Sequence, residues 1–405
     1  MIRPISFVLF VALISANRNE QTVESVNYLG LVLLLGLVPL VAVIGAWFFA
    51  GGKIVALIAT WILLLAWFMS IYFFSLPAAL HVSTNNQVFL NDVLILFPAL
   101  FWLSVLWFVT SPIANRISWV SHRLRLDALL LLIPLLIFIG ISELAFSFGF
   151  QEGTTSLIEL VGIIALLGFA PFFIEIILPA KSINNHELCS EIASIGRRAS
   201  VQKTKVLVWN THNRIMNALA IGIIFQPKKI VLTDKLLNNL TKRELLAVAA
   251  HEFGHHKYWH LPFLIITAIA ALVCSSQLFT FMAFDLGGSF VLISQVVIVI
   301  FAIIFVSRQF ELQADAYSAV DISKSTGSDF VTQDGADALS SALVAIATTQ
   351  NFNINRSDLL HGSIASRTTN LQNLVGCNIT ELAINKRIVF LKIGLIVLLV
   401  IGCVI

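Results

Sequence analysis

The feature that most constrains this chain is a series of long apolar segments, each close to the ~20 residues with which a helix crosses a bilayer. Runs of that length cross as helices, because a helix satisfies its own backbone N–H and C=O groups. Hydrophobic residues make up 58% of the chain and charged residues 12%, against about 45–50% and about 25% in soluble domains. We therefore predict a mainly α fold, a polytopic α-helical membrane protein with about eight spans. The spans are expected at 28–50, 54–77, 93–111, 128–149, 156–178, 262–283, 289–307 and 388–405.

Basic residues in the short loops indicate the orientation of these spans. Arg116, Arg123 and Arg125 crowd one loop, and short loops rich in Lys and Arg stay on the cytoplasmic side of a membrane. The alternation of spans then places the long segments 180–261 and 308–387 in the cytoplasm. We expect an integral, multi-pass protein of a cell inner membrane or an endoplasmic-reticulum-like membrane, with its chemistry facing the cytoplasm.

The apolar segments divide the chain into four parts. Residues 1–16 look like a signal peptide or a short anchor, because a basic start precedes a short apolar stretch. Residues 28–178 are expected to form an N-terminal membrane region of five spans. Residues 180–387 are expected to form a domain that a membrane hairpin at 262–307 interrupts, and 388–405 a C-terminal apolar helix.

The first part of that domain mixes helical and strand patterns. Residues 187–200 look helical, and Thr241 followed by Glu244 forms a capping box that starts a further helix. Between them lie three runs of β-branched and apolar residues that predict a small β-sheet. These runs are Val206–Trp209, Leu219–Phe225 and Ile230–Leu232.

One short motif on the capped helix points to chemistry. Residues 251–255 read H-E-F-G-H, which is the pattern H-E-x-x-H. Positions four apart lie above one another on a helix, so His251 and His255 can bind one metal ion at roughly 2.0–2.1 Å. Glu252 is offset around the helix and can act as general base toward a water molecule that the ion activates.

A catalytic zinc ion needs a third protein ligand, and Glu311 is the candidate. Glu311 follows the cytoplasmic end of the 289–307 span, and His255 precedes the cytoplasmic start of the 262–283 span. The ends of a membrane hairpin emerge at the same height, so Glu311 is expected near the two histidines. Asp315, one turn further on, is suited to accept the outer N–H of a histidine ligand. We predict one zinc ion per chain, and the alternative is an ordinary solvated helix end.

With these motifs the chain resembles the membrane-embedded zinc metallopeptidases of the gluzincin type, which include the type I CAAX prenyl protease and the bacterial heat-shock membrane protease. Residues 251–255 match the family's H-E-[LF]-G-H, and Arg308, Glu311 and Asp315 match its R-x-x-E-x-x-A-D. The resemblance implies a cytoplasmic zincin-like metalloprotease domain. It also implies that Arg308 and Asp315 support the ligands from outside.

The resemblance extends to residues that would handle substrate. Asn217 and Ala218 resemble the family's edge strand, which holds substrate by strand addition, and an ordinary turn into a core strand is the alternative. His361 and Arg367 resemble the family's H-P-S-x-x-x-R block, whose side chains steady the tetrahedral intermediate. Gly362 stands where that block has proline, and this substitution loosens the backbone beside His361, although glycine can adopt the same φ.

The predicted function is that of an integral-membrane zinc metalloendopeptidase acting on membrane or membrane-associated proteins. Two alternatives stay open: a CAAX prenyl protease acting on prenylated C-termini, and a transporter-like membrane protein with a non-catalytic metal site. The expected partners are a protein or peptide substrate and membrane lipid, and the net charge of +3 implies no nucleic-acid partner. His256 and His260 flank the motif, and we expect them at the surface or the membrane interface without a role.

Overall fold

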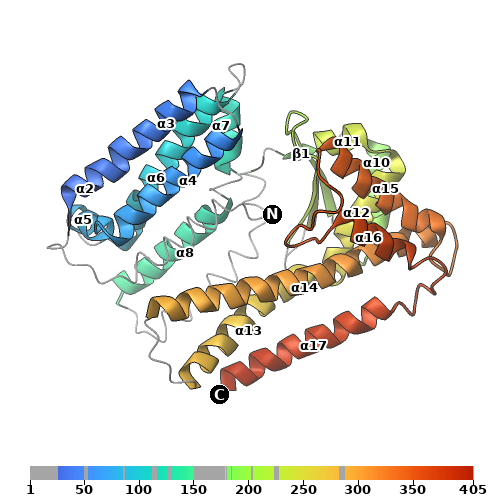
Figure 1. Cartoon of the computed structure of the whole chain (residues 1–405). Helices are drawn as coiled ribbons and strands as arrows, with labels where there is room; N and C mark the ends of the chain where they lie inside the picture. Colours follow the sequence, from blue (N-terminus) through green and yellow to red (C-terminus); the bar gives the residue numbers. More distant parts are fainter. Residues whose placement is uncertain are drawn as a thin grey trace. The chain divides into compact units, whose positions relative to one another are not determined.

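The structure of the protein is a computed structural model, drawn in Figure 1. The predicted segment 1–16 lies outside the residues that it describes, as does the predicted span 156–178 apart from its last residue. The chain divides into two compact units, Met1–Leu166 and Leu167–Ile405. The described residues are 26–49, 53–84, 87–111, 116–125, 130–149, 178, 180–183, 185–201, 204–222, 228–281 and 288–404.

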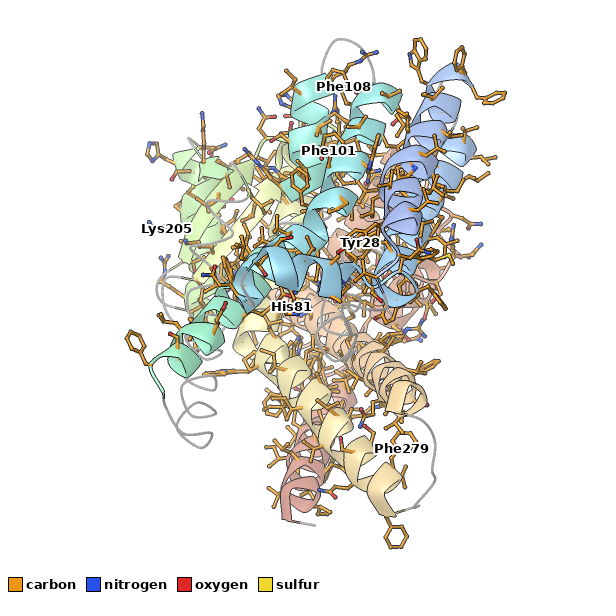
Figure 2. The ribbon with its side chains drawn as sticks, turned by 90° about the vertical axis from the view of Figure 1, so that its left-hand side faces the viewer. Tyr28, His81, Phe101, Phe108, Lys205 and Phe279 are labelled. Carbon is orange, nitrogen blue, oxygen red and sulfur yellow. The ribbon has the colours of Figure 1, made fainter. Side chains whose placement is uncertain are left out.

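The first unit is built from apolar helices. Its described helices are α2 (Tyr28–Val32), η2 (Leu33–Leu37), α3 (Val38–Phe48), α4 (Lys53–Tyr72), α5 (Leu76–Ser83), α6 (Val88–Thr110), α7 (Arg116–Leu124) and α8 (Leu130–Ser147). Trp67 of α4 is buried and donates from Nε1 to the Ile95 carbonyl of α6 at 2.7 Å. Figure 2 labels Phe101 and Phe108 on α6, which are 48% and 41% exposed. Exposed aromatic side chains of this kind fit a surface in contact with lipid.

Three long helices of the second unit, α13 (His260–Phe281), α14 (Gly288–Ser325) and α17 (Ala383–Val404), pack against one another (Figure 1). Among the described residues, five helices have the length and hydropathy to cross a membrane. Two further helices, α8 and α17, coincide with predicted spans but are not among these five. The prediction of a multi-pass membrane protein is therefore confirmed. The number of eight spans and the cytoplasmic orientation stay predictions. The five are Tyr28–Phe48, Ile54–Tyr72, Phe89–Thr110, His260–Phe279 and Val297–Ser325.

A small mixed sheet stands beside the helices of the second unit. Its strands are β1 (Ala180–Ser182), β2 (Thr204–Trp209), β3 (Ala218–Ile221) and β4 (Lys228–Thr233), in the order β1-β2-β4-β3. β2 and β4 are parallel, and β1 and β3 pair with them antiparallel. The predicted small sheet is confirmed, and β3 forms one of its edges. The remaining helices are α10 (His186–Arg198), α11 (Asp234–Asn239), α12 (Lys242–Lys257), α15 (Gln333–Thr349) and α16 (Ile364–Gln372).

The helix α14 joins the membrane part of the second unit to the rest of it. It runs unbroken over 38 residues, which corresponds to about 57 Å at 1.5 Å per residue. It packs on α13, and it also packs on α12 and α15, where Ser318 of α14 contacts α12. The predicted hairpin is thus formed by α13 and α14, and its second arm continues as the helix that carries Glu311.

Candidate metal centre

The helix α12 is held by its N-terminal cap and by a buried face. Thr241 N donates to Glu244 Oε2 at 2.8 Å, and Glu244 N donates to Thr241 Oγ1 at 3.3 Å, so the predicted capping box is confirmed. Ala249, Ala250 and Phe253 are fully buried in the core of the unit. This face fixes the rotation of α12 and therefore the direction of the side chains of the H-E-x-x-H motif.

α12 and α14 approach each other closely at Gly254. A Cβ atom at this position would lie only 3.1 Å from the Ala314 Cα atom. One turn away, Ser318 Oγ of α14 donates to the Ala247 carbonyl of α12 at 2.7 Å. Because Ala314 lies in the turn with both predicted carboxylates, this contact brings them level with the histidines of α12.

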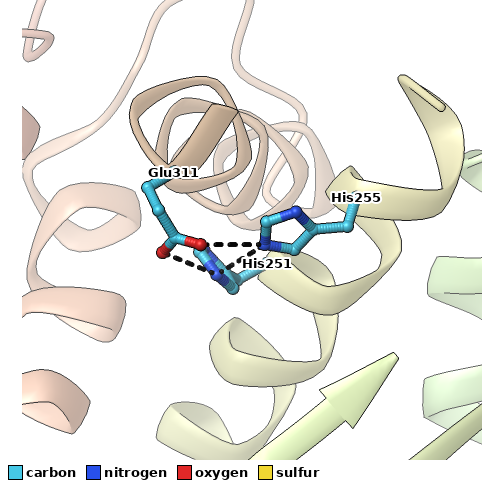
Figure 3. Close-up of side chains that lie close together, drawn as sticks. All are labelled: His251, His255 and Glu311. Carbon is cyan, nitrogen blue, oxygen red and sulfur yellow. Dashed lines mark hydrogen bonds and ion pairs between the residues drawn. The ribbon is translucent and has the colours of Figure 1, made fainter. Parts of the chain in front are cut away.

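His251, His255 and Glu311 meet where these helices touch, as Figure 3 shows. The Nε2 atoms of His251 and His255 are 3.1 Å apart. Glu311 Oε2 lies 3.6 Å from His251 Nε2, and Glu311 Oε1 lies 3.5 Å from His255 Nε2. One ligand atom from each residue lies within 4.8 Å of the other two. The structure thus brings the three predicted ligands together.

The geometry of this cluster fits a zinc ion. Two nitrogens bound to one tetrahedral ion at roughly 2.0–2.1 Å lie about 3.3 Å apart, close to the spacing of the two Nε2 atoms. Glu311 Oε2 is buried and accepts no hydrogen bond. It faces the guanidinium of Arg367 at 3.3 Å and keeps a lone pair that a metal ion can use. Two imidazoles and one carboxylate also leave a fourth position open, as catalytic zinc sites do.

Burial governs the protonation of the α12 side chains. It raises the pKa of Glu252, although the charge of His251 and the backbone N–H of Ala220 partly counteract it. Burial also lowers the pKa of His255 to about 4. His255 is therefore neutral at pH 7, which is the form that binds a metal. A glutamate with a raised pKa is suited to exchange protons near neutral pH.

A buried ion pair between Asp315 and Arg367 supports the cluster. Arg367 Nε and Nη2 donate to Asp315 Oδ2 and Oδ1 at 2.8 and 2.6 Å. Asp315 Oδ1 also lies 2.9 Å from His251 Nδ1, the outer nitrogen of that ligand. Arg367 Nη1 lies 3.3 Å from Glu311 Oε2. The guanidinium that was expected at an oxyanion thus contacts the two carboxylates of α14.

His361 reaches the cluster from the loop before α16. Its Nε2 lies 3.9 Å from Glu311 Oε1, and its Nδ1 lies 3.1 Å from Asp358 Oδ1. Arg308 holds the same loop, because it donates from Nε to the Leu359 carbonyl at 3.1 Å and from Nη2 to the Asp358 carbonyl at 3.2 Å. Arg308 therefore supports the loop of His361 more directly than it supports the ligands.

Gly362 adopts a backbone conformation that proline cannot. Its φ is +76°, whereas the proline ring fixes φ near about −65°. Its N–H donates to the Asp358 carbonyl at 3.2 Å, and the Asp358 N–H donates to the Gly362 carbonyl at 2.9 Å. Glycine therefore does not use the φ of the family's proline at this position, and a tight turn closed by these two bonds places His361 instead.

The edge strand β3 runs past the catalytic helix. The backbone of Asn217 is hydrogen-bonded to Thr233 of β4. Its N–H donates to Thr233 Oγ1 at 3.0 Å, and its carbonyl accepts from Thr233 N at 3.1 Å. Bonded and non-bonded pairs alternate along an antiparallel ladder, so the backbone groups of Ala218 and Ala220 point away from β4. Ala220 and His255 line one small cavity of about 30 Å³.

Sequence reasoning missed two contacts in this region. His256 and His260 are 6% and 1% exposed, so they do not lie at the protein surface, and their expected position at the membrane interface stays a prediction. His260 contacts His255, and helical spacing could not reveal this because α12 ends at Lys257 and the chain turns at Trp259, where φ is +56°. The contact of Asp358 with His361 was also missed, although its three-residue spacing was a usable signal.

Comparison with known proteins agrees with the motifs. The model of Peptidase family M48 matches residues 182–332. A CAAX prenyl protease 1 homolog of Dictyostelium discoideum is 37% identical over 94 residues, 22% of each chain. CAAX prenyl protease 1 of Saccharomyces cerevisiae is 32% identical over 131 residues, 32% of this chain and 27% of that protein. A Protease HtpX homolog of Archaeoglobus fulgidus is 28% identical over 152 residues, 37% of this chain and 43% of that protein.

The fold has a counterpart among solved structures. The crystal structure of S. mikatae Ste24p matches with a TM-score of 0.51 and 19% identity, over 91% of this chain and 99% of that chain. The matched segments span less than half of the length of the curated relatives. Residues 182–332 nevertheless include the H-E-x-x-H motif, Glu311 and Asp315, and the chain therefore carries a Peptidase family M48 domain, the family that its motifs predict.

Proposed function

We propose that this protein is an integral-membrane zinc metalloendopeptidase that hydrolyses peptide bonds of membrane or membrane-associated proteins. The observation that carries the proposal is the convergence of three ligand atoms from His251, His255 and Glu311 within 4.8 Å. A bound zinc ion would polarise the substrate carbonyl and lower the pKa of a water molecule. We place the site on the cytoplasmic side, because the arginine-rich loop predicts that orientation.

Glu252 is the proposed general base. Its raised pKa lets it accept a proton from the attacking water and return that proton to the leaving amine. It follows His251 on α12, so the cap and the buried face that orient the two histidines orient this carboxylate as well. The neighbouring N–H of Ala220 keeps part of its negative charge stabilised.

We propose that the substrate backbone binds along the free edge of β3. The outward N–H and C=O groups of Ala218 and the outward C=O group of Ala220 offer an extended peptide the pairing that an edge strand lacks. The N–H of Ala220 bonds to Glu252 instead. Because Ala220 borders Glu252 and His255, a peptide added here would pass close to the metal ligands. Asn217, whose backbone is paired with β4, then marks the start of the binding edge.

His361 and Arg367 have different proposed roles. The His361 side chain is 43% exposed and is oriented by Asp358, so it can donate to a developing oxyanion. The Arg367 side chain is only 10% exposed and contacts both Glu311 and Asp315. We propose that the main role of Arg367 is to hold these two carboxylates in place, and that contact with the tetrahedral intermediate is a lesser role.

A CAAX prenyl protease is the second candidate function. It is favoured by the names of the two relatives with the higher identities, 37% and 32%, which are both CAAX prenyl protease 1 proteins. These matches cover 22% and 27% of those proteins, and a comparison of prenylated with unprenylated substrates tests this candidate. A transporter with a non-catalytic metal site is disfavoured, because structural zinc sites normally have four protein ligands, whereas the cluster among the described residues has three.

The test is Glu252→Gln in the purified, detergent-solubilised full chain. We expect wild-type zinc content and loss of cleavage of an unfolded membrane-protein substrate, since the ligands stay and the base is removed. Glu381→Gln, which changes an exposed carboxylate, is the control and should leave both unchanged. A wild type that binds no zinc, or an active Glu252→Gln variant, would overturn the proposal. Farnesylated and unprenylated peptides, assayed side by side, separate the two candidate functions.

A further inference from the structure

A chain of hydrogen bonds leads away from the outer nitrogen of His255. His260 Nδ1 lies 2.9 Å from His255 Nδ1, and His260 Nε2 lies 3.0 Å from Gln313 Oε1. Gln313 Nε2 in turn donates to Asn385 Oδ1 at 2.9 Å. The four residues come from α12, α13, α14 and α17, so the chain connects a candidate metal ligand to three helices that pack together at the membrane part of the unit.

Only one direction of this chain is compatible with a metal ion on His255. The Nε2 atom must offer its lone pair to the ion, so the neutral ring carries its proton on Nδ1. That N–H donates to His260 Nδ1, which leaves the proton of His260 on Nε2, where it donates to Gln313 Oε1. The Gln313 amide N–H then donates to Asn385. Every donor along the chain meets an acceptor in this direction.

The ring of His260 is fixed independently of the metal. It is 1% exposed and stacks on Phe310 with ring centroids 4.4 Å apart and planes 4° apart. Tyr258 stacks at a centroid distance of 5.9 Å and an angle of 22°. These contacts hold the acceptor Nδ1 in place, so that it can orient the neighbouring imidazole.

We propose that His260, Gln313 and Asn385 are positioning residues, which select the Nδ1–H tautomer of His255 and aim its Nε2 at the metal ion. The proposal rests on the metalloprotease function proposed above. It gives the two histidine ligands different supports, since His251 faces the carboxylate of Asp315 and His255 faces a neutral imidazole. Outer partners of metal-bound histidines typically change metal affinity by about 10–100-fold when removed.

The first test measures zinc affinity of the purified full chain by competition with a chelator. His260→Phe keeps a flat ring against Phe310 but removes the acceptor, and we expect zinc affinity to fall by about 10–100-fold. His260→Asn can place an amide oxygen near the position of Nδ1 and should recover most of the loss. His256→Asn is the matched control, because it removes a neighbouring buried imidazole that is not part of this series of hydrogen bonds. It should bind zinc like wild type.

A double substitution tests whether the residues act as one chain. Gln313→Leu should weaken zinc binding less than His260→Phe, because His260 keeps its contact with His255. In the His260→Phe background, Gln313→Leu should add little further loss, since coupled residues are not additive. Wild-type affinity in His260→Phe, or an equal loss in all three single histidine variants, would overturn the proposal.

The second test reads the tautomer directly in zinc-free protein. ¹⁵N NMR of labelled histidine should show His255 protonated on Nδ1 in wild type and a mixture of tautomers in His260→Phe, with the resonance identified by its loss in His255→Asn. A His255 ring protonated on Nε2 in wild type would overturn the proposed series of hydrogen bonds. A wild type that binds no zinc would instead contradict the proposed metalloprotease, while the tautomer in metal-free protein would still decide the role of His260.

Discussion

Gly254 and Ala314 set the separation of the two helices that carry the metal ligands, because a Cβ atom at position 254 would lie 3.1 Å from the Ala314 Cα atom. We predict that Gly254→Ala moves α12 and α14 apart by a few tenths of an ångström and weakens zinc binding. The stability should fall by no more than about 2 kcal/mol, since overpacking costs about 1–3 kcal/mol and the higher helix propensity of alanine offsets about 1 kcal/mol of that. Zinc affinity and the thermal unfolding midpoint are the measurements.

Gly394→Ala is the matched control for this prediction. Gly394 also lies within a helix of the second unit, but a Cβ atom there would meet nothing within 4 Å. Its zinc affinity should equal that of wild type. A Gly254→Ala protein that binds zinc as tightly as the control would show that the close approach does not set the ligand spacing.

The ion pair of Asp315 and Arg367 should contribute to both stability and zinc binding. Asp315→Asn leaves the buried guanidinium with one carboxylate, and breaking a buried pair in this way costs about 3–5 kcal/mol. It also weakens the acceptor for His251 Nδ1, which should lower zinc affinity by about 10–100-fold. Chemical unfolding and chelator competition measure the two effects.

A second substitution separates charge burial from ligand support. Arg367→Met in the Asp315→Asn background removes the buried charge that has lost its bidentate partner and should restore part of the stability, while zinc affinity stays low. If the double variant regained zinc affinity as well, the orientation of His251 by Asp315 would be refuted.

Arg308→Ala should lower the turnover number while zinc stays bound. Arg308 donates to the carbonyls of Asp358 and Leu359, so its loss frees the loop that presents His361. The cleavage rate at saturating substrate and the zinc content are the measurements. Arg356→Ala removes an exposed arginine of the same loop and should leave both unchanged. A loss of zinc in Arg308→Ala would mean that Arg308 supports the ligands themselves.

The parts of the site that follow from helical periodicity could be predicted from the sequence. His251 and His255 lie one turn apart, the capping box of Thr241 marks where their helix begins, and the α13–α14 hairpin returns Glu311 to the same height. Each of these relations depends on spacing along the chain within a known secondary structure. The small sheet could be predicted for the same reason, from three short runs of β-branched residues.

The contact of Asp315 with His251 was predicted from helical spacing, but other supporting contacts could not be, because they join side chains that no periodicity relates. The turn at Trp259 swings His260 back onto His255, and only the packing of α13 against α14 brings Gln313 to it. The direction of Arg308 toward the loop of His361 depends likewise on how that loop folds. The number of spans is a different case, since the predicted span 156–178 lies almost wholly outside the described residues.

Gly362→Pro installs the residue that the related H-P-S-x-x-x-R motif has, and we predict that it lowers activity here. The φ of +76° at this position is closed to proline, and proline also removes the N–H that donates to the Asp358 carbonyl. Because Asp358 orients His361 through Nδ1, the turnover number should fall while zinc content stays that of wild type.

Gly362→Ala distinguishes the two causes of that loss. Alanine keeps the N–H, and the left-handed conformation costs it about 1–2 kcal/mol of strain. The turnover number of Gly362→Ala should therefore lie between those of wild type and Gly362→Pro. A Gly362→Pro enzyme as active as wild type would show that the loop can take the proline conformation without moving His361. The turn at Gly362 would then be a local alternative with no bearing on catalysis.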